Sequence, residues 1–90
     1  ESSALRYKEN IQDLEYNNLI SQLKPKIYNK IGEEKQEVGL IAEDVEVLDN
    51  TLVTYNEDGE IEGIQYTRLV PHLIAHIHKL EERLAALENG

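Results

Sequence analysis

The chain has 90 residues and no cysteine, methionine, phenylalanine or tryptophan, which excludes disulfides and thiolate metal sites as supplements to its core. A chain of this length forms at most one domain, predicted over residues 1–90, and as a monomer it buries only about 60 to 65 per cent of its unfolded surface. No apolar run approaches the roughly 20 residues that span a bilayer, and the first residues show no signal-peptide pattern, so no membrane partner is expected. Leu, Ile, Val and five Tyr are left to fill the core, which favours a core shared between subunits. The absence of an initiator Met predicts a piece of a longer protein.

The net charge of −9 is unevenly distributed. Residues 31–63 carry eleven acidic side chains against Lys35 alone, a net −10, whereas residues 1–30 sum to +1 and residues 64–90 to zero. Because the acidic middle repels phosphate and no basic stripe offsets it, nucleic acid is not expected as a partner. The acidic segment is either a solvated surface that keeps an oligomer soluble or an adaptor for a basic partner.

The first half of the chain predicts short elements. Apolar residues at helical spacing over 11–23 predict a helix that Pro25 ends. Residues 26–30 alternate and predict a strand, followed by a charged loop at 32–36 and a compact apolar run at 38–41.

The middle of the chain predicts a helix and a hairpin. Residues 42–48 place acids in a first turn, where the helix dipole favours them, and Asp49-Asn50 ends that helix. Residues 52–55 and 60–64 predict strands joined by the Asn-Glu-Asp-Gly turn at 56–59, whose glycine supplies a positive φ. The same turn resembles a calcium loop, but its twelfth position is Gln65, so the hairpin is the better interpretation.

Residues 66–88 predict one amphipathic helix, with Thr67 as N-cap and Pro71 in the first turn. Its 4-3 apolar ladder is typical of a parallel coiled coil and leaves dimer and trimer open, the alternative being a helix folded onto its own core. The ladder has Val70, Ile77 and Leu84 at heptad position a and Tyr66, Leu73, Leu80 and Leu87 at d.

Edge charges on this helix favour pairing between chains. Arg83 at g precedes Glu88 at e by five residues, and His76 and Glu81 repeat that spacing, which places opposite charges across a parallel interface. His72 and His76 stand at a spacing that zinc uses, but no third ligand is near, so no metal or cofactor is expected.

Ser3 and Lys8 place a hydroxyl and an amine five residues apart, with Arg6 between them. A lysine amine can serve as the general base for a serine nucleophile when its surroundings favour the neutral form. Ser2 is a competing nucleophile, six residues from Lys8. Such pairs occur by chance in most proteins, so the pair alone does not identify a peptidase.

Three separated segments carry a resemblance to a known family: residues 3–11, residues 38–45 (Val-Gly-Leu-Ile-Ala-Glu-Asp-Val) and residues 65–71 (Gln-Tyr-Thr-Arg-Leu-Val-Pro). In this order and spacing the chain resembles the intramolecular chaperone auto-processing domain that ends phage tailspikes, endosialidases and neck or tail fibres and also occurs in the myelin regulatory factor. Ala4 departs from the Asp or Ser often found at its position.

The resemblance implies a homotrimer that promotes trimerisation and folding of an upstream fibre and then cuts itself off. It implies Ser3 as nucleophile, Lys8 as base and Ser2–Ser3 as the scissile bond. Arg6 would hold Lys8 neutral by like-charge repulsion or orient the carbonyl under attack. The expected partners are other copies of the chain and the upstream segment of the same polypeptide, in the host cytoplasm during virion assembly, with release from the mature particle after cleavage.

The sequence therefore predicts an α+β head over residues 1–65 and a coiled-coil stalk over 66–88. The trimer interface is predicted at Val70, Leu73, Ile77, Leu80, Leu84 and Leu87. Packing within the head, near the trimer axis, is predicted to join Gly39, Ala42, Glu43, Tyr66 and Arg68, with Arg68 facing a carboxylate of Glu43 or Asp44 in a neighbouring chain. The alternative function is a permanent trimerisation or attachment domain without an enzymatic step.

Overall fold

A computed structural model describes residues 1–90 and has the α+β composition predicted from the sequence. No helix is both long and apolar enough to cross a membrane. In chain order the elements are the 3-10 turn η1 (Leu5–Tyr7), α1 (Leu19–Gln22), β1 (Lys26–Tyr28), β2 (Glu37–Gly39), α2 (Ala42–Leu48), the 3-10 turn η2 (Asn50–Leu52), β3 (Val53–Tyr55), β4 (Ile61–Ile64), the 3-10 turn η3 (Tyr66–Arg68) and α3 (Leu69–Asn89).

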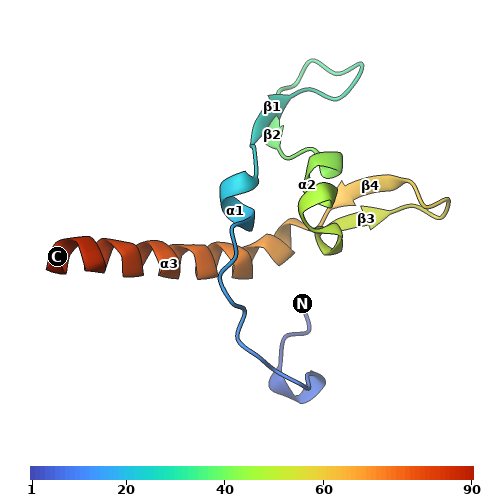
Figure 1. Ribbon diagram of the computed structural model, residues 1–90. Helices are drawn as coiled ribbons and strands as arrows, with labels where there is room; N and C mark the ends of the chain where they lie inside the picture. Colours follow the sequence, from blue (N-terminus) through green and yellow to red (C-terminus); the bar gives the residue numbers. More distant parts are fainter.

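The molecule is elongated, with principal dimensions of 53 × 36 × 22 Å. Figure 1 shows α3 projecting to one side, with the β1–β2 and β3–β4 hairpins and α2 gathered near its N-terminal end. Residues 1–18, which we call the N-terminal arm, run past α3 and end apart from the hairpins (Figure 1). The hairpins and the arm therefore leave most of the length of α3 uncovered.

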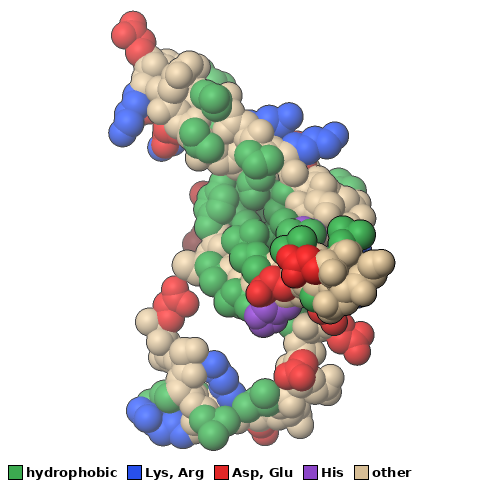
Figure 2. Space-filling model, turned by 90° about the vertical axis from the view of Figure 1, so that its left-hand side faces the viewer, with side chains coloured by type: hydrophobic (Ala, Val, Ile, Leu, Met, Phe, Trp, Pro, Cys, Tyr) green, Lys and Arg blue, Asp and Glu red, His purple; other side chains and the backbone are tan.

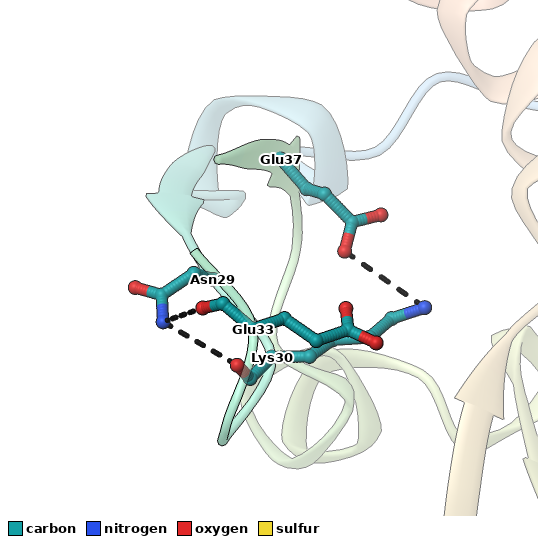
Figure 3. Close-up of polar contacts among 4 residues, drawn as sticks. All are labelled: Asn29, Lys30, Glu33 and Glu37. Atoms are coloured by element: carbon teal, nitrogen blue, oxygen red, sulfur yellow. Dashed lines mark hydrogen bonds and ion pairs between the residues drawn. The ribbon is translucent and has the colours of Figure 1, made fainter. Parts of the chain in front are cut away.

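The first hairpin pairs β1 with β2 antiparallel, with Ile27 opposite Val38. Its loop is held by Asn29, whose Nδ2 donates to the carbonyl oxygens of Lys30 (3.3 Å) and Glu33 (2.7 Å) (Figure 3). An ion pair of 3.8 Å between Lys30 Nζ and Glu37 Oε2 closes the same loop. The predicted strand and charged loop are thus confirmed, and the apolar run that follows begins inside β2.

The second hairpin pairs β3 with β4 through the predicted turn. Asn56 Oδ1 accepts hydrogen bonds from the backbone N–H groups of Asp58 and Glu60, both at 2.9 Å. Gly59 has φ +81°, the left-handed conformation that glycine adopts without steric cost. The hairpin interpretation of this segment is confirmed.

The core consists of five side chains that come from α1, α2, the η2–β3 segment and the start of α3. Val45 and Leu52 are the most completely buried. Helix α2 has the bounds predicted for it, and Asp49 follows it in extended conformation. The core residues are Leu19, Val45, Leu52, Val53 and Leu69.

The predicted helix over 11–23 is mostly wrong, because only Leu19–Gln22 is helical. Asn17 Oδ1 accepts a hydrogen bond from the Leu19 N–H at 3.0 Å and so starts the helix there. Asn10 has φ +54°, which interrupts the chain upstream. The apolar spacing of Ile11 and Leu14 therefore belongs to an extended arm, on which both side chains are exposed.

The prediction of Thr67 as helix N-cap is also wrong, because Thr67 lies inside η3, which continues into α3. The turn is anchored to the preceding η2 segment by one backbone and one side-chain hydrogen bond: the Gln65 N–H donates to the Leu52 carbonyl at 2.8 Å, and the guanidinium Nη1 of Arg68 donates to the Thr51 carbonyl at 3.3 Å. Pro71 falls in the first turn of α3, as expected.

The hydrogen bonds of Asp49 make the stability of the fold depend on pH. Its Oδ1 accepts from Thr51 Oγ1 (2.7 Å) and from the Thr51 N–H (2.9 Å), and these bonds lower the pKa of Asp49 below the ordinary 3.8. Because the folded-state pKa is the lower one, the stabilisation is full above pH 3.8 and is lost as the pH falls through the folded-state value.

We expect Asp49→Ala to lower the free energy of unfolding at pH 7 by about 1 kcal/mol, the usual cost of losing such a cap. In urea unfolding of both proteins, the difference should shrink below pH 3.8. A difference that stays constant down to pH 2 would show that the carboxylate is not its source.

Candidate active site

Ser3 and Lys8 meet across the turn η1. The Tyr7 N–H donates to the Ala4 carbonyl (3.1 Å) and the Lys8 N–H donates to the Leu5 carbonyl (3.0 Å), which folds the chain back on itself. Lys8 Nζ lies 3.0 Å from Ser3 Oγ, within hydrogen-bond distance. The turn thus brings together a hydroxyl and an amine that could exchange a proton.

Arg6 points to its neighbour Tyr7. Its Nη2 donates to the Tyr7 hydroxyl at 2.8 Å, and its Cζ lies 4.5 Å from the centroid of the Tyr7 ring. No hydrogen bond joins Arg6 to Ser3 or Lys8. Its supporting role in catalysis stays a prediction, as does the Ser2–Ser3 scissile bond.

The arm around this pair is exposed. All hydrogen bonds of residues 1–15 are made within that segment. Leu5 and Tyr7 expose 74% and 63% of their surface, so apolar groups beside the pair have no cover in the single chain. In Figure 2 the arm borders an opening between itself and the rest of the molecule. A site for chemistry here requires a further surface that excludes water.

A second group of predicted residues gathers where β2 meets η3. The Tyr66 hydroxyl accepts from the Leu40 N–H at 2.8 Å and lies directly over Gly39. Ala42 and Glu43 border the same surface hollow. The structure brings these residues together, whereas Arg68 is turned away to the Thr51 carbonyl. Its pairing with a neighbouring chain stays a prediction.

The predicted trimer interface forms an exposed apolar stripe on α3. Leu73, Ile77 and Leu80 expose 44%, 53% and 48% of their surface in the single chain. Figure 2, which looks along α3 from its C-terminal end, shows hydrophobic side chains gathered at the centre of the view. The stripe continues through the remaining interface positions Val70, Leu84 and Leu87.

Sequence reasoning missed Tyr16 as a residue that contacts α3. Its ring stacks on His76 with 5.7 Å between the centroids, and Lys79 Nζ and Arg83 Cζ each lie 5.6 Å from its centroid. The spacing of positions 76, 79 and 83 places them on one face of a helix, and this pattern could have indicated a shared contact with an aromatic ring. The assumption that residues 11–23 were helical concealed it.

A family model described as the chaperone of endosialidase, of the peptidase class, matches residues 3–54, more than half of the chain. The chain belongs to the chaperone of endosialidase family. No curated protein and no solved structure matches. The resemblance found in the sequence is therefore confirmed at the level of the family.

The chaperone of endosialidase match contains the Ser3–Lys8 pair at its very start and ends within β3. It also contains α2 and both strands of the first hairpin. Helix α3, with its apolar stripe, lies outside the matched residues. Membership therefore gives a chaperone-type role to the part of the chain that holds the pair.

Gly39 gives a test of the packing beside η3. A Cβ at this position would stand 2.8 Å from the Tyr66 hydroxyl, closer than real Cβ contacts allow, and 3.1 Å from that of Tyr28, which is tighter than most. We expect Gly39→Ala to lower the free energy of unfolding by about 1–3 kcal/mol through overpacking.

The matched control is Tyr66→Phe, which removes the nearer oxygen. The alanine should cost less in the Tyr66→Phe background than in the wild type, and urea denaturation of the four proteins measures the coupling. Equal costs in both backgrounds would contradict the contact as the cause.

Proposed function

We propose that this chain is a homotrimeric intramolecular chaperone. It promotes trimerisation and folding of a phage tail fibre or tailspike segment upstream in the same polypeptide. It then releases itself by cutting the Ser2–Ser3 bond with Ser3 and Lys8, in the host cytoplasm during virion assembly. Membership in the chaperone of endosialidase family supports the chaperone-type role.

The observation that carries the proposal is the 3.0 Å contact between Lys8 Nζ and Ser3 Oγ. General base catalysis needs this reach between the base and the proton it removes. The contact is made by a local 3-10 turn, and it joins Lys8 to Ser3 and not to the competing nucleophile Ser2. The matched family is of the peptidase class and its match begins at Ser3, so a serine–lysine contact has a catalytic use there.

The chemistry follows from the position of the nucleophile. Lys8 in its neutral form takes the proton of the Ser3 hydroxyl while Oγ attacks the carbonyl carbon of Ser2. Oγ and the amide nitrogen belong to the same residue, so attack closes a five-membered ring. The C–N bond then breaks, the protonated Lys8 returns its proton to the leaving amine, and the Ser2 acyl group remains on Oγ as an ester. Water hydrolyses that ester, which restores the Ser3 hydroxyl and frees the upstream chain.

Assembly is supported by what a single chain leaves uncovered. Only five of 90 residues are buried, and the stripe from Val70 to Leu87 is exposed along α3. Each fully covered Leu or Ile contributes about 1.5–3 kcal/mol, so three helices packed along this stripe supply the stability that the single chain lacks. The 4-3 spacing matches the parallel coiled coil that such packing requires.

Assembly explains how the domain acts as a chaperone. Three chains held together by α3 have their upstream segments at about millimolar effective concentration, so a slow non-local fold starts in register. Cutting afterwards leaves the upstream trimer kinetically trapped, because the helper that would allow the chains to separate and reassociate has gone.

With the native sequence upstream, Ser3→Ala and Lys8→Ala should each abolish release of the fragment of about 10 kDa, because nucleophile and base act as one unit. Denaturing electrophoresis follows the fragment. Ser2→Ala and Lys24→Ala serve as matched controls and should cut normally. A permanent trimerisation domain would release no fragment from any of these chains, and normal cutting by Lys8→Ala would eliminate the pair as the catalyst.

The stalk gives an independent prediction. Leu80→Asp should dissociate the trimer, because three carboxylates in one buried layer cannot all be ionised without a large desolvation cost. It should also block cleavage, although Leu80 lies far along the sequence from Ser3.

Sedimentation equilibrium at about 50 μM, a concentration at which a stable assembly stays associated, measures the dissociation of the trimer. Ala85→Asp adds the same carboxylate at an exposed position off the stripe and should stay trimeric. A wild-type monomer or dimer would refute the trimer.

A further inference from the structure

The arm has one point of attachment to α3 that lies outside the core. Leu19 is buried in the core, and three residues before it the Tyr16 ring rests on His76, Lys79 and Arg83. Upstream of Tyr16, Leu14 and Ile11 are 48% and 63% exposed. Tyr16 is therefore the last side chain that holds the arm before it leaves toward the Ser3–Lys8 pair.

The side chains of α3 that surround Tyr16 favour an aromatic ring at that position. Both cations lie 5.6 Å from the ring centroid, within the 6 Å at which a ring face attracts them. Nδ1 of His76 is buried without a hydrogen-bond partner, so the imidazole contributes its flat surface and no polar contact. Both His76 and Lys79 are partly buried in the single chain.

The position of this contact on α3 matters for assembly. His76 and Arg83 occupy heptad position g and Lys79 occupies c, so Tyr16 lies on the flank next to the exposed stripe. In a parallel bundle each g position of one helix faces the e position five residues on in the next helix, here Glu81 for His76 and Glu88 for Arg83. Both glutamates are exposed in the single chain and are available for that contact.

We propose that Tyr16 is a positioning residue that seats the arm in the groove between its own α3 and the α3 of a second copy of the chain. The seated arm directs residues 3–8 to one place on the assembly and couples cleavage to stalk formation. This rests on the proposed function, because it assigns a regulator to the same Ser3–Lys8 site. The proposal goes beyond the proposed function because it names the contact of Tyr16 with α3 as the link between stalk formation and the Ser3–Lys8 site.

The test uses the chain with its native upstream sequence and three readouts: cleavage rate, trimer content by sedimentation, and hydrogen exchange of residues 11–18. Tyr16→Ala should leave trimers intact, remove protection of residues 11–18, and slow cleavage by about tenfold or more, since small misplacements of reacting groups cost this much. Tyr16→Phe keeps the ring and should match the wild type in all three. Tyr55→Ala removes a ring from β3, away from the arm, and is the matched control.

Lys79→Gln with Arg83→Gln removes both cations from the ring while keeping good helix formers at both helix positions. This double variant should slow cleavage and loosen residues 11–18 in the same direction, and it decides the question if Tyr16→Ala does not fold. The proposal would be overturned if Tyr16→Ala cleaved at the wild-type rate although its arm is unprotected. It would also be overturned if residues 11–18 of this variant stayed fully protected or if its trimer dissociated. If the wild type itself does not cut, the proposed function fails, whereas hydrogen exchange of residues 11–18 still decides whether Tyr16 seats the arm.

Discussion

Helix α3 carries more apolar surface than its own chain can cover, and the rest of the structure depends on this shortage. Its N-terminal turn contributes Leu69 to a core of five buried residues, but beyond that point the stripe residues stay 44% to 80% exposed. A single chain with so small a core is marginally stable. Association along α3 is the remedy that we propose, and it would make folding, oligomerisation and the placement of the arm one coupled event.

The candidate site has the opposite character, because it is built locally. One 3-10 turn of three residues is enough to bring Ser3 and Lys8 within 3.0 Å. What the turn cannot supply is shelter from water, since the apolar side chains of Leu5 and Tyr7 beside it are exposed. A pair formed locally and sheltered only in an assembly would stay inactive until the chains have come together, which is the order that an assembly helper needs.

Much of the fold could be predicted from the sequence where local chemistry decides the conformation. The turn at 56–59, helix α2 and the long helix α3 follow from glycine, acids in a first turn, and apolar spacing. Residues 11–18 could not be predicted, because their apolar spacing imitates a helix while Asn10 and Asn17 favour an extended arm. Tyr16 was missed for the same reason, since its role depends on how a non-helical arm crosses α3. The pairing of Ser3 with Lys8 was predicted from the family resemblance and not from spacing alone, and the stacking of Arg6 on Tyr7 was not predicted.

We propose that the assembled chain cuts itself at the Ser2–Ser3 bond, through the residue that follows that bond. Mass spectrometry of the fragment released from a chain with its native upstream sequence tests this most directly. We expect a fragment that begins at Ser3 with a free, unmodified amino group, because the ester on Oγ is hydrolysed in the last step. A fragment that begins at any other residue, or a chain that stays whole after forming trimers, would contradict it.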